Sequence, residues 1–242
     1  MSDQENQILV IDGAGDTCGI MLVTNGKEYY QKLNSQRLTE EIIPNINQAL
    51  KSLKIKLKDV NFIGWNQGPG SFTSLRITAS IVQGLSIPLN IKVVGFSTFD
   101  FLLESLHLEN KKILCTIDAR SQEVYWGIYQ FDKNNSNINN IQIKKEISVD
   151  SPQKVINYLK HQKIKIDFVI GNAIDIYSDF KKHGLIPIKI PNHQNQLRAI
   201  IKRIKTKQNI NAYPPADLPL YVRKKVAKSL DEQTIWHQRI TR

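Results

Sequence analysis

The chain has 242 residues, of which 41% are hydrophobic, and its 33 Lys or Arg and 22 Asp or Glu give a formal net charge of +11. This length and apolar content allow one large domain or two small ones, and we expect two. The sequence contains neither a run of about 18 apolar residues nor an N-terminal basic segment followed by an apolar one, which argues against a membrane anchor. We therefore expect a cytoplasmic protein.

The residue types that usually carry metal or nucleophilic chemistry are sparse. Both cysteines, Cys18 and Cys115, lie in apolar strand-like runs rather than in a CxxC spacing, so we expect two buried thiols. No GxSxG motif and no HxxxH or HExxH spacing occurs. We expect no catalytic residue and no metal ligand. Solvent-exposed histidines without a function are expected at His107, His161, His183, His193 and His237.

The first part of the chain contains signals for three strands and then a helix. Residues 8–11 and 18–23 are β-rich, and the Asn-Gly pair behind them is typical of a hairpin that leads into a third strand at 28–33. Apolar residues at helical spacing then predict the first helix at 40–53. The N-terminus is thus expected to form an antiparallel three-stranded unit followed by a helix.

A glycine-braced turn follows the next predicted strand, residues 60–65. Gly68, Pro69 and Gly70 specify a tight reversal, and Ser71 is suited to cap the helix behind it. The turn can be read as part of a specific functional motif or as an ordinary strand-to-helix turn before an ordinary core helix. The turn alone does not decide between these two interpretations. The apolar face of the predicted helix consists of Phe72, Leu75, Ala79, Val82 and Leu85.

The element order predicts the fold class. A strand at 91–94 and a helix opened by Ser97 and Asp100 complete the order βββαβαβα, after which the pattern restarts. The ribonuclease-H-like domains of the actin superfamily use this order, so by analogy we expect an α/β fold with two such domains, each a mixed β-sheet flanked by helices. The expected domains are residues 1–109 and a smaller second one at 110–242.

The second half carries weaker signals. Strands are expected at 113–118 and 124–131, a basic amphipathic helix at 194–205 and a strand at 220–222. Residues 198–242 contain eleven Lys or Arg and three Asp or Glu. Such a segment suits contact with RNA phosphates, and solubility is the alternative that the sequence leaves open. Further elements are expected at 155–159, 168–170 and 186–190.

One motif carries a family resemblance. The run GPGSFTSLRI at residues 68–77 closely resembles the GPGSFTGVRI signature of the TsaB family. The resemblance is weakest between residues 132 and 211. Four further segments are similar to that family, in the same order along the chain: residues 8–23, 92–103, 113–130 and 218–227.

The resemblance implies a function. Proteins of the TsaB family are partner subunits of the bacterial machinery that makes N6-threonylcarbamoyladenosine at position 37 of tRNAs reading ANN codons. They bind the catalytic transferase paralogue (TsaD-like), a small ATPase (TsaE-like) joins the assembly, and tRNA is reached through the complex. A homodimer is expected when the paralogue is absent. By this resemblance the chain is a non-catalytic dimerisation and activating subunit.

The resemblance also implies a partner surface. The first two helices of both subunits form a four-helix bundle in the family, and here they correspond to residues 40–53 and 71–87. The residues expected to contact the partner or to set the geometry of this surface are Ile43, Ile46, Leu50, Gly68, Pro69, Gly70, Ser71, Phe72, Leu75, Arg76, Ala79 and Val82.

The turn after the first strand resembles a degenerate phosphate loop. Gly13 and Gly15 stand where the family commonly carries Thr or Ser, so the side-chain hydroxyls that would contact a phosphate are missing. Asp12 is suited to a metal, but we favour a turn-capping role for it. We expect no cofactor, and a nucleotide at the partner interface stays open. Two alternative functions stay open as well: an enzyme of the actin-like superfamily, either kinase or peptidase, and a basic tRNA-binding module.

Overall fold

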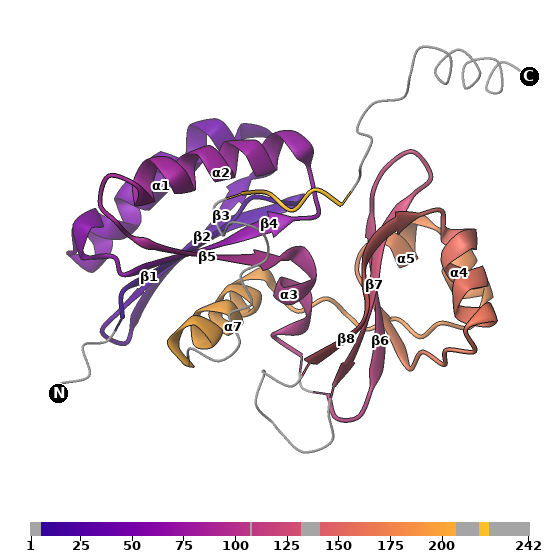
Figure 1. The fold of residues 1–242 in the computed structure, drawn as a ribbon. Helices are drawn as coiled ribbons and strands as arrows, with labels where there is room; N and C mark the ends of the chain where they lie inside the picture. Colours follow the sequence, from indigo (N-terminus) through magenta and orange to yellow (C-terminus); the bar gives the residue numbers. More distant parts are fainter. Residues whose placement is uncertain (1–5, 107, 132–140, 207–217, 223–242) are drawn as a thin grey trace, which may run out of the picture.

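The computed structural model describes residues 6–106, 108–131, 141–206 and 218–222, which form two α/β halves (Figure 1). The first half contains a five-stranded sheet in the order β3-β2-β1-β4-β5. β2 runs antiparallel to β1 and β3, whereas β4 is parallel to both β1 and β5. The mixed sheet confirms the expected fold class. Its strands are β1 (Ile8–Asp12), β2 (Thr17–Thr24), β3 (Lys27–Asn34), β4 (Phe62–Gly68) and β5 (Lys92–Ser97).

Helices cover both faces of the first sheet. α1 and α2 lie on one face and α7 on the other (Figure 1). Every residue of β1 is buried, and its side chains alternate between the two layers as a strand requires: Leu9 and Ile11 face α1 and α2, while Ile8 and Val10 face α7. The three helices are α1 (Leu38–Leu53), α2 (Phe72–Ser86) and α7 (His193–Thr206).

α7 returns to the first sheet after the chain has built the whole second half. The basic amphipathic helix expected at 194–205 is therefore present, but it does not belong with the second half. Leu197, Ile200 and Ile204 are fully buried among apolar residues of the first sheet. This placement departs from the expected domain of residues 110–242. Helical periodicity indicates that a helix has an apolar face, but it does not indicate which sheet that face covers.

The second half contains a four-stranded sheet in the order β8-β7-β6-β9. β6, β7 and β8 form an antiparallel meander, and β9 pairs parallel to β6. Short helices cover one face of this sheet and pack with it into a separate apolar core. The elements are β6 (Lys112–Asp118), β7 (Val124–Phe131), β8 (Ile141–Asp150), α4 (Pro152–His161), β9 (Phe168–Ile170), α5 (Ala173–Ile176) and α6 (Ser178–Lys182).

α3 (Thr98–Leu103) joins the two halves and lies between their sheets (Figure 1). It begins with a capping box, in which the Ser97 side chain accepts a hydrogen bond from the Asp100 N–H and the Asp100 carboxylate accepts one from the Ser97 N–H. Phe99 and Leu103 then pack against the face of the second sheet that α4 leaves open. The helix start expected from Ser97 and Asp100 is confirmed.

The element expected at 186–190 and the strand expected at 220–222 have a different form. Residues 186–190 make only one isolated bridge, between Val169 and Pro187, and residues 220–222 form no strand. The latter segment is nevertheless held, because the Leu220 N–H donates to the Gln67 carbonyl oxygen at 2.8 Å. Periodicity predicts extended chain in both places but not whether a neighbouring strand completes a ladder.

Candidate functional site

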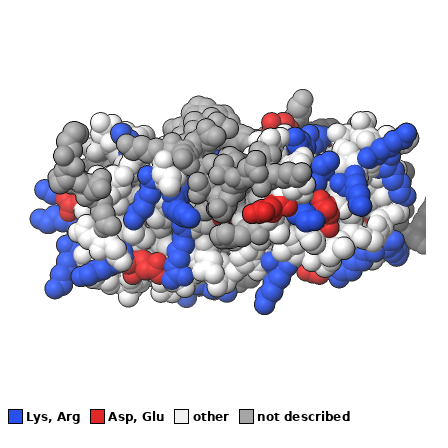
Figure 2. Space-filling view, turned by 90° about the horizontal axis from the view of Figure 1, so that it is seen from below, with Lys and Arg blue, Asp and Glu red and all other residues white. Residues whose placement is uncertain are grey.

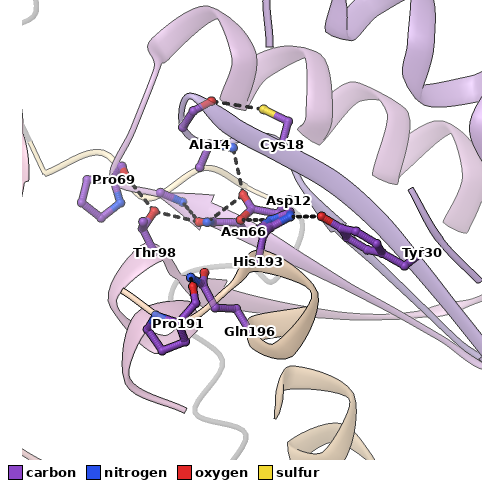
Figure 3. A network of polar contacts seen from close by, with 12 residues as sticks. Asp12, Ala14, Cys18, Tyr30, Asn66, Pro69, Thr98, Pro191, His193 and Gln196 are labelled. Carbon is purple, nitrogen blue, oxygen red and sulfur yellow. Dashed lines mark hydrogen bonds and ion pairs between the residues drawn. The ribbon is translucent and has the colours of Figure 1, made fainter. Parts of the chain in front are cut away.

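The turn after β1 is the position where an actin-like enzyme would hold phosphate and metal, and here the Asp12 carboxylate already has three partners (Figure 3). Its Oδ1 accepts hydrogen bonds from the Ala14 N–H at 3.1 Å and from the Asn66 side-chain amide at 3.0 Å. Its Oδ2 lies 3.1 Å from Nε2 of His193. The side chain is 7% exposed. Asp12 therefore caps its turn, as expected, and also binds two distant elements.

His193 corrects the expectation of an exposed histidine without a role. It is the first residue of α7, its side chain is 8% exposed, and it bridges Asp12 on one side and the Tyr30 hydroxyl, 3.1 Å from Nδ1, on the other. The Tyr30 and His193 rings also meet edge-on. Sequence reasoning missed this contact because 181 residues separate His193 from Asp12 and no local motif marks either partner.

The other histidines fall into two groups. His161 and His183 are exposed, as expected. His107 and His237 lie outside the described residues. Within the described ranges, no group of three or more His, Cys, Asp or Glu side chains is arranged to hold a metal ion. Both cysteines are buried as expected, and burial raises the pKa of the Cys18 thiol to about 12.

The glycines of the phosphate-loop turn differ in their surroundings. A Cβ on Gly13 would lie 2.2 Å from Oγ1 of Thr78, so α2 fills the space that a Ser or Thr side chain would need. A Cβ on Gly15 would meet only the Thr17 nitrogen, at 4.0 Å. The packing of α2 against this turn thus excludes a Ser or Thr side chain at position 13, whereas position 15 has space for one.

The glycine-braced turn is packed directly on the phosphate-loop turn. The Ser71 N–H donates to the Ala14 carbonyl oxygen at 2.7 Å, and a Cβ on Gly70 would lie 2.1 Å from that same oxygen. Gly68 has a φ of 103°, which an L side chain rarely adopts, and the Gly68–Pro69 peptide bond is cis. The positive φ of Gly68 and the close approach of Gly70 to Ala14 explain why the motif requires glycine on both sides of the proline.

Asn66 connects this turn to Asp12 and to α3 (Figure 3). Its side-chain oxygen accepts a hydrogen bond from the Gly68 N–H at 2.9 Å and lies 2.9 Å from Oγ1 of Thr98. The Thr98 hydroxyl also lies 2.7 Å from the Pro69 carbonyl oxygen. The ends of β1, β4 and β5 are thereby fixed by one buried polar network.

A cavity of about 380 Å³ opens between the two halves, beside this network. Gly15, Ser71 and the segment 220–222 line it from the first half, and Asp118 and Asn172 from the second. The Asp12 carboxylate is not part of its lining.

Asp118 occupies in the second half the strand-end position that Asp12 has in the first. Its Oδ1 accepts hydrogen bonds from the Tyr177 hydroxyl at 2.7 Å and from the Arg120 N–H at 2.9 Å. Burial, reinforced by the Asp118 carboxylate, raises the pKa of Tyr177 to about 12. This carboxylate, like that of Asp12, is therefore engaged within the chain.

Burial corrects part of the expected partner surface. Several of the residues proposed from helical spacing face the first sheet, because α1 and α2 use their main apolar stripes to cover their own core. The remaining helix positions are accessible: Ile43 is 38% and Phe72 37% exposed, and Arg76 and Ser71 are exposed. The expected helix residues that are buried, and therefore not accessible to a partner in this arrangement, are Ile46, Leu50, Leu75, Ala79 and Val82.

Part of the accessible surface is covered by the segment 218–222. The Tyr221 ring packs against Phe72 with centroids 5.9 Å apart, and the Arg76 guanidinium lies 3.8 Å from the Phe72 ring centroid. The Gln67 side chain donates to the Leu218 carbonyl oxygen at 2.6 Å, which holds the start of this segment. The start of α2 is thus already in contact with another part of the chain.

Both arginines in the described part of the basic segment 198–242 form intramolecular ion pairs. Arg198 binds Glu28 of β3, which lowers the pKa of that carboxyl. Arg203 binds Asp100 at 3.1 Å and also binds Glu104. Residues 207–217 and 223–242 lie outside the described residues. Among the helices of the described ranges, none combines the length and apolar character needed to span a membrane.

Comparison with known proteins identifies relatives over most of the chain. A family model described as TsaD, tRNA N6-adenosine threonylcarbamoyltransferase, matches residues 30–235. The tRNA threonylcarbamoyladenosine biosynthesis protein TsaB of Buchnera aphidicola from Acyrthosiphon pisum is 35% identical over 53% of this chain and 60% of its own length. TsaB of Haemophilus influenzae is 28% identical over 92% of this chain and 96% of its own length.

Solved structures support the fold. YeaZ from Pseudomonas aeruginosa superimposes with a TM-score of 0.66 at 20% identity, covering 89% of this chain and 100% of that one.

TsaB of Escherichia coli, 34% identical, matches 53% of this chain, and the chain spans 57% of its length. With the match over residues 30–235 and the GPGSFTSLRI turn, the chain belongs to the family of tRNA N6-adenosine threonylcarbamoyltransferases and their relatives, as a member of its TsaB (YeaZ) group.

Proposed function

We propose that the chain is a non-catalytic subunit of the complex that forms N6-threonylcarbamoyladenosine at position 37 of tRNAs reading ANN codons. The observation that carries this proposal is the state of the β1 turn. The Asp12 carboxylate, which an actin-like enzyme would direct at metal and water, accepts hydrogen bonds from Ala14 and Asn66 and contacts His193. Chemistry is then left to the transferase paralogue, which this chain binds and activates.

The surface that we assign to the paralogue is the outer face of α1 and α2. Ser80 and Gly84 lie one turn apart on α2 and are both exposed, and a Cβ on Gly84 would meet nothing within 4 Å. Small residues at this spacing let another helix approach closely. Ile43 on α1 and Ile87, which is 73% exposed, add apolar area at either side. This surface suits a helix pair from the partner.

The other members of the assembly follow from the same proposal. A small ATPase joins the pair, tRNA is bound through the complex, and the chain self-associates through α1 and α2 when the paralogue is absent. The work takes place in the cytoplasm, and the chain holds no cofactor of its own. Support for self-association comes from the exposed apolar residues of this face, which would otherwise remain in water.

The test is complex formation with an exposed-face variant. Ser80→Arg introduces a long charged side chain at the centre of the proposed interface, while Asn157→Arg places the same side chain on an exposed position of α4. We expect the unmodified chain and Asn157→Arg to form a 1:1 complex with the transferase paralogue by light scattering, and Ser80→Arg to form none. Val82 is unsuitable for this purpose because it is fully buried.

Both variants should retain the circular dichroism and unfolding midpoint of the unmodified chain, since each changes an exposed residue. A folded Ser80→Arg chain that still binds the paralogue with unchanged affinity would remove α2 from the interface. The proposed function itself fails if the unmodified chain forms no complex.

A further inference from the structure

The turn that follows α4 presents a cationic cavity on the second half of the molecule. Lys160, Lys163, Lys165 and His183 line an open cavity of about 390 Å³, and apolar side chains of α4 and the following loop complete its lining. Within the described part of the chain, no carboxylate lines this cavity. We refer to these four residues as the α4-turn surface. It is separate from α1, α2 and the cleft between the halves.

The C-terminus of α4 is capped by backbone hydrogen bonds and does not depend on the side chains of the α4-turn surface. The Ile164 N–H donates to the Leu159 carbonyl oxygen at 2.9 Å, and the Lys163 N–H donates to the Lys160 carbonyl oxygen at 3.1 Å. Backbone donors therefore satisfy the last carbonyls of the helix. Lys163 has a φ of 49°, in the left-handed region that favours glycine, so the backbone gains nothing from a lysine at this position.

Carboxylates at this end of the molecule pair with lysines outside the α4-turn surface, and Lys165 lies near enough to Asp167 to favour the charged form of that carboxylate. Figure 2 shows Lys and Arg side chains over the right-hand end, formed by the second half, with Asp and Glu nearer the middle. Asp167 accepts a hydrogen bond from the Lys112 N–H and pairs with Lys111, and Asp175 pairs with Lys181. Among the described residues, the three lysines of the α4-turn surface are exposed and lie within ion-pair distance of no carboxylate.

This chemistry favours a polyanion over a folded protein partner. Lysine is depleted in the cores of protein–protein interfaces, and its ammonium on a flexible stem binds phosphate as a point charge. RNA offers phosphates at regular spacing, and a protein that neutralises several of them gains affinity from the release of condensed counterions. The cavity volume of about 390 Å³ leaves room for ribose beside the phosphates.

We propose that the α4-turn surface binds the sugar–phosphate backbone of the tRNA substrate, independently of base sequence. This inference rests on the proposed function, which brings tRNA to the complex. The two described arginines of the basic segment 198–242 are paired within the chain and are not offered to RNA. The subunit then contributes directly to holding the substrate while the paralogue carries out the transfer.

The chain supplies a matched pair of variants for the test. Lys54-Ile55-Lys56 follows α1 just as Lys163-Ile164-Lys165 follows α4, with a left-handed lysine first in each case, at φ values of 55° and 49°. Lys163→Gly with Lys165→Gln removes two charges from the α4-turn surface, and Lys54→Gly with Lys56→Gln removes two from the other turn. Glycine suits the backbone at both positions, so both variants should fold as stably as the unmodified chain.

The measurement is the affinity of the complex with the transferase paralogue for an unmodified tRNA transcript that reads an ANN codon, over a series of salt concentrations. At about 100 mM salt we expect the Lys163 variant to bind roughly tenfold more weakly, with a log–log salt slope smaller by about 2. The Lys54 variant should match the unmodified complex. Transcripts of different sequence should lose affinity equally, since the contact reads no bases.

Other outcomes overturn the proposal. Unchanged affinity in the Lys163 variant removes the surface from the RNA, and an equal loss in both variants means that only net charge matters. Loss of the complex itself in the Lys163 variant would assign the surface to a protein. Complex formation is measured first by light scattering: if the unmodified chain forms none, the proposed function fails, and the two variants are compared for tRNA binding as free chains, with the same expected order.

Discussion

The imidazole of His193 joins three parts of the chain that are distant in sequence. It contacts Asp12 at the end of β1 and Tyr30 on β3, and it begins α7. The imidazole also lies close to β2, since a Cβ on Gly19 would lie 2.8 Å from the imidazole Cε1. A single buried side chain thus fixes α7 in register with the phosphate-loop turn.

We predict that His193→Ala destabilises the fold. The substitution leaves a buried carboxylate oxygen of Asp12 and the Tyr30 hydroxyl without their common partner, which should cost about 2–4 kcal/mol in the free energy of unfolding. His161→Ala, at an exposed position of α4, is the matched control and should change it by less than about 0.5 kcal/mol. Urea denaturation measures both, and equal values for the two would contradict the assigned role of His193.

Local polar chemistry could be predicted from the sequence, and long-range partners could not. The capping role of Asp12 and the capping box of Ser97 and Asp100 involve groups two or three residues apart, so the sequence alone contains both partners. The contacts of Asp12 with Asn66 and His193 depend on how the strands are ordered and where α7 returns. Nothing in the residues around Asp12 indicates these partners.

At the scale of elements, α7 completes the first sheet rather than adding a surface helix. Ile200 is fully buried in the layer that also contains Val10 and Phe96. Without α7 that face of the sheet would expose a row of apolar side chains. The helix is therefore part of the core of the first half, although it is encoded after the second half.

We predict that Ile200→Ala lowers the free energy of unfolding by about 2–5 kcal/mol, because it leaves a cavity between α7 and the sheet. Lys202→Ala changes an exposed residue of the same helix and should have an effect below about 0.5 kcal/mol. Chemical denaturation followed by tryptophan fluorescence is suitable, since Trp65 is buried in the first half. Near-equal midpoints for the two variants would mean that α7 docks only weakly.

Periodicity predicted which positions of α1 and α2 are apolar but not what covers them. The spacing that marks Leu75, Ala79 and Val82 as one face is real, and all three residues are buried. The face available to a partner is formed instead by smaller and more polar positions such as Ser80 and Gly84. A helix beside a sheet needs its most apolar face for its own core. The accessible face of α2 is therefore a different face from the one expected at the interface.

At the scale of the whole molecule, an ion cluster lies where α7 meets α3. Arg203 binds both Asp100 and Glu104, and its side chain is 14% exposed. Glu104 is 2% exposed, and its second carboxylate oxygen has no hydrogen-bond partner among the described residues. Burial raises the pKa of Glu104 to about 8, although Arg203 opposes the shift. The cluster therefore gives the stability of the fold a pH dependence.

We predict that the free energy of unfolding falls as pH rises from about 5 to 8. The Glu104 pKa is higher in the folded chain than its ordinary value of 4.5, so the folded state binds more protons in this window and loses stability as they are removed. Glu104→Gln should make the pH profile flatter, whereas Glu109→Gln, at an exposed carboxylate, should leave it unchanged. Urea titrations at several pH values test this, and parallel profiles for all three chains would contradict it.

The late return of α7 sets the order in which the protein can fold during synthesis. When the ribosome has completed α3, one face of the first sheet is still without its cover, and roughly 90 residues must be added before α7 emerges. At about 5–20 residues per second this takes on the order of 5–20 s. During that time the second half is free to form its own core, while the first half stays open and aggregation-prone. The nascent chain is therefore most dependent on chaperones after its N-terminal strands are made, not before.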